Sequence, residues 1–121
     1  KVARYTARKK AALMLDAGII RNRAKIEAAV SNARAFLAVQ KECGSFAAYA
    51  WAFVDDKPLA GKRKSAGDIP ARTERSDALS KDLNARGFKF VGSTIVYAFM
   101  QATGMVNDHT VRCFRYKEIN R

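Results

Sequence analysis

The chain has 121 residues, of which 49% are hydrophobic, a composition that fits one folded domain with a modest core and excludes a disordered chain. Its 23 basic and 11 acidic residues give a formal net charge of +12 at pH 7. Such a charge attracts polyanions, and it favours a nucleic acid as partner over the alternative of a highly soluble basic protein without one.

No apolar run approaches the roughly 20 residues that a membrane-spanning helix needs, and the N-terminal residues do not resemble a signal peptide. The two cysteines, Cys43 and Cys113, do not make a disulfide framework. We therefore expect a protein of the reducing cytoplasm that does not bind membranes, in which the thiols either ligate a metal or are inert and buried.

Three helices are predicted in the first half of the chain. Leu13 and Met14, followed by Gly18, indicate a helix whose clearest part is 11–17. A second helix is predicted over 24–42, because one apolar stripe recurs at intervals of four and three and Gly44 follows it. The residues of this stripe are Ile26, Val30, Ala33 and Leu37.

The stretch "SFAAYAWAFV" that follows is apolar on nearly all sides, which indicates a short buried helix with Ser45 as its N-cap and Trp51 in the core. Residues 55–75 contain both prolines and no apolar period, so they are predicted to form one long loop. Its basic residues, Lys62, Arg63 and Lys64, are assigned no site.

Two further helices are predicted after this loop. Ser76 is the expected N-cap of the first, in which Asp77 opposes the helix dipole, and Gly87 ends it. Its expected buried residues are Ala78, Leu79 and Leu83. The second helix opens at 92–94 and ends at Gly104.

Four residues between two glycines, Phe88–Val91, form a predicted hairpin between these helices. The backbone amides that follow it lie at a helix N-terminus, where glycine allows close approach and the dipole favours a phosphate. The candidate DNA-binding residues are Gly87, Lys89, Gly92, Ser93 and Thr94. Such a contact reads no base. The alternative, a tight helical hairpin with Phe88 and Phe90 in the core, is equally compatible with the spacing.

His109 and Cys113 are separated by three residues, a spacing that can present a nitrogen and a thiolate to zinc on one face of a helical turn. Two ligands are half of a structural site. On spacing alone, an unrelated histidine and a free thiol remain the simpler interpretation.

Four blocks of sequence, in this order, carry a resemblance to a known family. They are "DAGIIRNRAKI" at 16–26, "NARAFL" at 32–37, "SDALSK" with "RGFKFVGSTIVYAFMQATG" within 76–104, and "VNDHTVRC" at 106–113. From residue 1 to about 116, the chain resembles the C-terminal two-thirds of the DNA-3-methyladenine glycosylase I family, bacterial base-excision repair enzymes with a helix-hairpin-helix fold.

The resemblance implies an all-α fold in one helical domain over 1–121, with the helix-hairpin-helix at 76–104 and a metal half-site and tail at 105–121. It implies monofunctional hydrolysis of the N-glycosidic bond of 3-methyladenine, flipped out of alkylated double-stranded DNA, by a protein that we expect to be monomeric. It also implies that His109 and Cys113 are half of a structural zinc site.

In the family, the glutamate and aromatic residues of the base pocket belong to an N-terminal segment without a counterpart in these 121 residues. We therefore assign no catalytic residue, and neither Glu27 nor Trp51 receives such a role. Two alternatives remain open, namely a truncated, inactive glycosylase and a helix-hairpin-helix module that binds DNA without chemistry.

The wider superfamily places a catalytic aspartate in a valine-aspartate-x-histidine segment, which here reads "VNDH" at 106–109. Asn107 falls at the position of the carboxylate, and an amide cannot act as a base. A third alternative is therefore a glycosylase that recruits Asp108. Bifunctional members carry a nucleophilic lysine where this chain has Thr94, so the resemblance implies no lyase activity.

Overall fold

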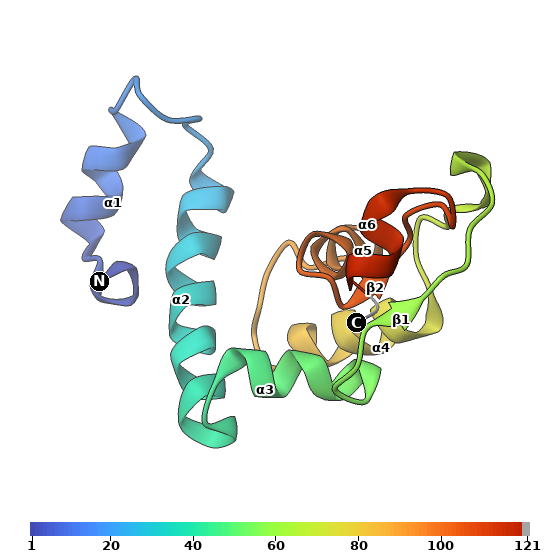
Figure 1. The fold of residues 1–121 in the computed structure, drawn as a ribbon. Coiled ribbons are helices and arrows are strands. Elements are labelled where there is room, and N and C mark those ends of the chain that lie inside the picture. The colour runs from blue at the N-terminus through green and yellow to red at the C-terminus, as the bar shows by residue number, and fades with distance from the viewer. Residues whose placement is uncertain (120–121) are drawn as a thin grey trace.

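The computed structural model describes residues 1–119 and shows an α-helical protein with two short strands (Figure 1). Helices α1 and α2 lie side by side, α3 crosses the end of α2, and the remaining helices gather beyond α3. The α-helices are α1 (Ala7–Met14), α2 (Arg23–Cys43), α3 (Phe46–Trp51), α4 (Glu74–Ala85), α5 (Ser93–Ala102) and α6 (Phe114–Ile119). The expected all-α fold is confirmed. None of the helices in the described part of the chain is long and apolar enough to cross a membrane.

Short elements connect these helices. They are the 3-10 helices η1 (Val2–Arg4), η2 (Ala52–Val54) and η3 (Ala66–Asp68) and the strands β1 (Leu59–Ala60) and β2 (Val106–Asn107). The last two residues of the predicted tail over 105–121 lie outside the described residues.

Side-chain caps set where the first three helices begin. The Asn22 side chain accepts a hydrogen bond from the Lys25 amide at 3.2 Å, and Ser45 caps α3 as predicted. Gly44 follows α2 with φ of 85°, a conformation that glycine adopts without strain. The helix predicted at 11–17 instead begins at residue 7, because Thr6 caps it.

Thr73, and not Ser76, is the N-cap of α4. The Thr73 hydroxyl oxygen accepts from the Ser76 amide at 3.3 Å, and the Ser76 hydroxyl oxygen accepts from the Thr73 amide at 2.8 Å. Both residues can cap a helix, and the reciprocal pair adds one turn before the predicted start. The predicted ends are confirmed, since Gly87 and Gly104 have φ of 92° and 78°.

The predicted loop over 55–75 contains a strand that pairs with the C-terminal part of the chain. Strand β1 runs parallel to β2, with Leu59 opposite Val106 and Ala60 opposite Asn107. A two-residue strand leaves no alternation in the sequence, which is why the prediction of a loop missed it.

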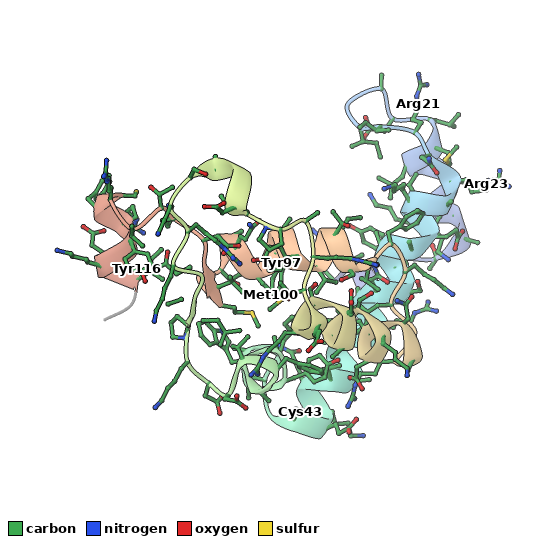
Figure 2. All side chains as sticks on the ribbon, turned by 90° about the vertical axis from the view of Figure 1, so that its right-hand side faces the viewer. Arg21, Arg23, Cys43, Tyr97, Met100 and Tyr116 are labelled. Atoms are coloured by element: carbon green, nitrogen blue, oxygen red, sulfur yellow. The ribbon has the colours of Figure 1, made fainter. Side chains whose placement is uncertain are left out.

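The hydrophobic core lies where α3, α4 and α5 meet the end of α2. Tyr97 and Met100 of α5 lie at its centre (Figure 2), with exposed fractions of 1% and 0%. Trp51 packs against this core, as predicted. Two predicted core residues are wrong, because Leu37 is 53% exposed and Ala78 is also exposed. The stripe on α2 is buried only at its N-terminal end, and elsewhere the helix buries Val39.

Asp108 is the centre of a polar network that joins β2 to α5 and to the segment after β1. The buried carboxylate accepts hydrogen bonds from the Tyr97 hydroxyl, from Gln101 Nε2 at 3.1 Å and from Arg63 Nε at 3.1 Å. Burial, reinforced by the bond to Asp108, raises the pKa of Tyr97 to about 12, so its hydroxyl stays protonated and donates.

Gly61 lies against this network, and we expect that Gly61→Ala destabilises the fold. An added Cβ would overlap Asp108 Oδ1 and would lie 2.8 Å from Arg63 Nε. Because Asp108 is fixed by three donors, the clash should lower the free energy of unfolding by about 1–3 kcal/mol, measured by urea denaturation. Gly67→Ala is the matched control, since its Cβ would meet only Ser65 Oγ at 3.9 Å. Equal stability of the two variants would contradict the prediction.

Candidate functional site

The hairpin Phe88–Val91 connects α4 to α5 and passes beside α2 (Figure 1). Phe88 is buried in the core, with an exposed fraction of 7%. Phe90 is 48% exposed and has φ of 58°, so only one of the two phenylalanines fills the core. The hairpin therefore combines an internal anchor with an exposed aromatic side chain.

Side chains from two other helices bind the backbone of the hairpin. On one side, Asn32 of α2 accepts from the Lys89 amide at 2.7 Å and donates to the Lys89 carbonyl at 3.0 Å. On the other side, the buried Ser80 hydroxyl of α4 donates to the Val91 carbonyl. Sequence reasoning missed both residues. Ser80 carried a signal, because it is a polar residue on the buried side of an amphipathic helix.

Arg86 anchors the start of this loop. Its guanidinium pairs with Asp82 at 2.8 Å and with Glu42 of α2 at 2.8 Å, and it lies 4.8 Å from the centre of the Tyr49 ring. Hydrogen bonds from Tyr49 and Arg86 lower the pKa of Asp82, which keeps its carboxylate charged. The pairs join α2, α3 and α4 directly before Gly87.

The predicted amide cluster lies at the N-terminus of α5. Gly92 is the N-cap and offers no capping side chain, and within residues 1–119 we find no acceptor for the amides of Gly92, Ser93 and Thr94. Gly92 has an ordinary φ of −60°, and a Cβ there would meet nothing within 4 Å. Glycine is therefore not needed for the backbone conformation, but it leaves the amides open to a bulky anion.

Ser93 contributes its amide and not its hydroxyl. The Ser93 hydroxyl is 2.8 Å from the Ser76 hydroxyl of α4, which turns it toward the interior. Lys89 is exposed next to the cluster and is in none of the ion pairs of the described residues. The structure thus brings together all five candidate DNA-binding residues around one loop, and their role in binding stays a prediction.

His109 and Cys113 are brought together in the turn that precedes α6. Cys113 Sγ is 3.8 Å from His109 Nδ1, and the His109 amide donates to Asn107 Oδ1 at 3.3 Å. Cys43 lies at the end of α2 (Figure 2). No group of three or more histidine, cysteine or acidic side chains that could hold a metal is present in residues 1–119. The described residues therefore bring this pair together without a third candidate ligand beside it, and its role in binding zinc stays a prediction.

Asn107 stands where the superfamily has its catalytic aspartate, and Asp108 follows it. Neither residue is available for acid–base chemistry. Asn107 is fully buried, and its amide nitrogen donates to the Tyr116 carbonyl at 2.7 Å. Asp108 is occupied by Tyr97, Gln101 and Arg63. This geometry does not favour the alternative in which Asp108 is recruited as a catalytic carboxylate.

Solved structures define the class of this fold. A crystal structure of 3-methyladenine DNA glycosylase I matches with a TM-score of 0.87 and 50% sequence identity, over 93% of this chain and 62% of that one. The Staphylococcus aureus 3-methyladenine DNA glycosylase I, solved for its recognition of 3-methyladenine, matches with a TM-score of 0.89 and 35% identity, over 94% and 61%. The fold is that of an all-α domain of the DNA glycosylase type.

Sequence comparisons give the family. A family model described as methyladenine glycosylase matches residues 1–116. The chain is 51% identical over 104 residues to DNA-3-methyladenine glycosylase 1 of Escherichia coli K12, covering 86% of this chain and 56% of that protein. It is 47% identical over 114 residues to DNA-3-methyladenine glycosylase of Haemophilus influenzae, covering 93% and 61%. The chain belongs to the methyladenine glycosylase family, and it spans about three-fifths of the length of these relatives.

If the amide cluster holds a phosphate, Gly92→Asp should weaken binding to any duplex, because it adds bulk and a negative charge at the open amides. We expect the affinity for an undamaged duplex to fall about tenfold or more at low salt, measured by fluorescence anisotropy. Gly67→Asp carries the same charge change at an exposed glycine of η3, outside the amide cluster, and should have a much smaller effect. Equal affinities of the two variants would exclude a phosphate site at Gly92.

Proposed function

We propose that this chain is the DNA-binding part of a monofunctional glycosylase that hydrolyses the N-glycosidic bond of 3-methyladenine in alkylated double-stranded DNA. One observation carries the proposal. The amides at the start of α5 are open, next to a hairpin whose backbone is bound by Asn32, in a chain that matches the methyladenine glycosylase family over residues 1–116. In this proposal, α4, the hairpin and α5 form a helix-hairpin-helix that binds the DNA backbone irrespective of sequence.

Hydrolysis of this N-glycosidic bond requires few functional groups from the protein. An alkylated purine carries a positive charge and leaves readily, and flipping it out of the duplex costs a few kcal/mol, less for a damaged base. We assign no catalytic residue to this chain, and we propose that the base pocket is completed by the part of a family-length protein that these residues do not cover. Because Thr94 offers no amine nucleophile, the reaction is hydrolysis without strand cleavage.

The activity can be tested with a family-length chimera, in which the N-terminal part of the Escherichia coli relative precedes Lys1. The chimera should release 3-methyladenine from methylated DNA and leave strands intact until alkali is added. The 121-residue chain alone should bind the same DNA without releasing the base. Failure of a folded chimera to release the base, while DNA binding persists, would favour the alternative of a non-enzymatic DNA-binding module. Borohydride trapping of a covalent adduct would contradict the monofunctional reaction.

We also propose that His109 and Cys113 supply two of four ligands to a structural zinc ion. Bond lengths of about 2.3 Å to sulfur and about 2.0 Å to nitrogen place two ligands of a tetrahedral zinc roughly 3.5 Å apart. The observed 3.8 Å between Sγ and Nδ1 fits this spacing, and the turn is already shaped by the Asn107 side chain. The ion, when bound, would hold the C-terminal turn to the segment that provides the remaining ligands.

We expect the 121-residue chain to bind zinc weakly, because a structural zinc site needs four protein ligands and, in this proposal, the chain supplies only two of them. The chimera should contain one zinc per molecule after dialysis, and His109→Ala should remove it. Metal content is measured on both forms, and cobalt substitution should give a thiolate charge-transfer band that Cys113→Ser weakens. One tightly held zinc in the short chain would show that the site closes without an additional segment.

Two further parts of the proposal are that the protein acts as a monomer and works in the cytoplasm. The free thiols of Cys43 and Cys113 are consistent with a reducing compartment.

A further inference from the structure

A groove lies between the N-terminal half of α2 and the hairpin, apart from the amide cluster. It has a volume of about 540 Å³ and is lined by Ala24, Glu27, Ala28, Ser31, Lys89 and Phe90. Ala24 and Ala28 contribute apolar lining on α2, and the groove runs along about two turns of that helix, a length of roughly 10 Å. We refer to this feature as the α2–hairpin groove.

Phe90 is the unusual residue of this groove. Its φ of 58° lies in the left-handed region, which is unfavourable for a bulky side chain, and its ring is 48% exposed. The neighbouring Lys89 backbone is fixed by Asn32, so the loop holds Phe90 in this conformation. Strain that presents an apolar ring to solvent, where core packing does not compensate for it, is typical of a binding surface.

Two cations border the groove. Lys25 Nζ lies 4.3 Å from the centre of the Phe90 ring, and Lys89 lines the groove beside the same ring. Neither lysine is in an ion pair of the described residues, whereas Glu27, the one carboxylate that lines the groove, is neutralised by Lys10 at 2.8 Å. The groove thus presents an apolar ring and floor between two unpaired positive charges.

Two more basic side chains lie at the N-terminal end of α2. Figure 2 shows Arg21 on the loop that precedes the helix and Arg23 at its first residue. A DNA strand advances about 3.4 Å along the duplex axis for each nucleotide. A groove of roughly 10 Å is therefore long enough to hold one phosphate and its attached sugar.

We propose that the α2–hairpin groove is a second DNA subsite, which binds a phosphate of the duplex backbone between Lys25 and Lys89 and the attached deoxyribose against Phe90. The inference rests on the proposed function, because it extends the same DNA interface from the α5 amides onto α2. A nucleotide backbone supplies the complementary chemistry, since each unit has one anionic phosphate and one apolar sugar face. The subsite positions the duplex and reads no base.

The test measures the affinity of the 121-residue chain for an undamaged duplex over a range of salt concentrations. Lys25→Gln should weaken binding about three- to tenfold and reduce the slope of log affinity against log salt by about 1, the value for one lost phosphate contact. Lys41→Gln is the matched control, because it removes the same charge from an exposed residue at the other end of α2. Equal effects of the two variants would overturn the subsite, since net charge alone would then explain the loss.

The Phe90→Gly variant distinguishes an effect on DNA binding from an effect on the stability of the fold. Glycine relieves the left-handed strain, so the thermal midpoint of this variant should stay the same or rise, whereas a ring with a structural role would lower it. The affinity for the duplex should nevertheless fall severalfold, with the salt slope unchanged. An unchanged affinity would overturn the role of the ring.

The Gly92→Asp variant distinguishes failure of this inference from failure of the proposed function. If Gly92→Asp weakens binding while Lys25→Gln and Phe90→Gly do not, the amide cluster binds DNA and the second subsite is wrong. If the parent chain does not bind duplex at low salt, both proposals are wrong.

Discussion

The polar backbone of the hairpin is held from two sides by side chains of helices that lie far from it in sequence. Asn32 satisfies both the amide and the carbonyl of Lys89, and Ser80 satisfies the Val91 carbonyl. An irregular loop next to a core must find such partners, because an unpaired buried polar group costs about as much as a lost hydrogen bond. In this part of the described chain, the backbone amides without an acceptor are those of Phe90 and Val91, late in the hairpin, and those of Gly92, Ser93 and Thr94 at the start of α5.

The need for partners of the hairpin backbone also determines which contacts α2 makes. The helix contacts the hairpin through Asn32 and Lys25, stacks Phe36 on Phe46 of α3 at 4.9 Å, and joins Arg86 through Glu42. Its apolar stripe is buried only in part, so polar and aromatic contacts attach α2 to the rest of the fold. The placement of the exposed Phe90 ring follows from this attachment, and with it the groove that we assign to the DNA backbone.

Most helices could be predicted from the sequence, because apolar period and terminating glycines are local signals. The bounds of α2 differ from the prediction by one residue at each end, and Gly87 and Gly104 adopt the expected left-handed conformation. The errors arose where two signals compete, as with Thr73 and Ser76, or where a contact is distant in sequence, as with the pairing of β1 and β2. No local pattern marks Asn32 as the partner of Lys89.

The residues of the candidate site could also be predicted only where the signal is local. The spacing of the hairpin glycines, and of His109 and Cys113, marked both sets as candidates, and the structure places each set together. The network around Asp108 was not predictable, because Arg63 lies 45 residues away in what reads as a basic loop. That network holds the segment directly before His109, so the position of the proposed zinc ligands depends on Arg63, Tyr97 and Gln101, to which the sequence assigned no role.

We propose that DNA binds to the open amides at the start of α5 and to the adjoining hairpin. Backbone amide chemical shifts of the 121-residue chain, followed by NMR during titration with an undamaged duplex, test it most directly. We expect the largest shift changes at Gly92, Ser93 and Thr94, with further changes at Lys89 and Phe90. Changes concentrated in the basic segment over 62–64, with the start of α5 unaffected, would contradict it.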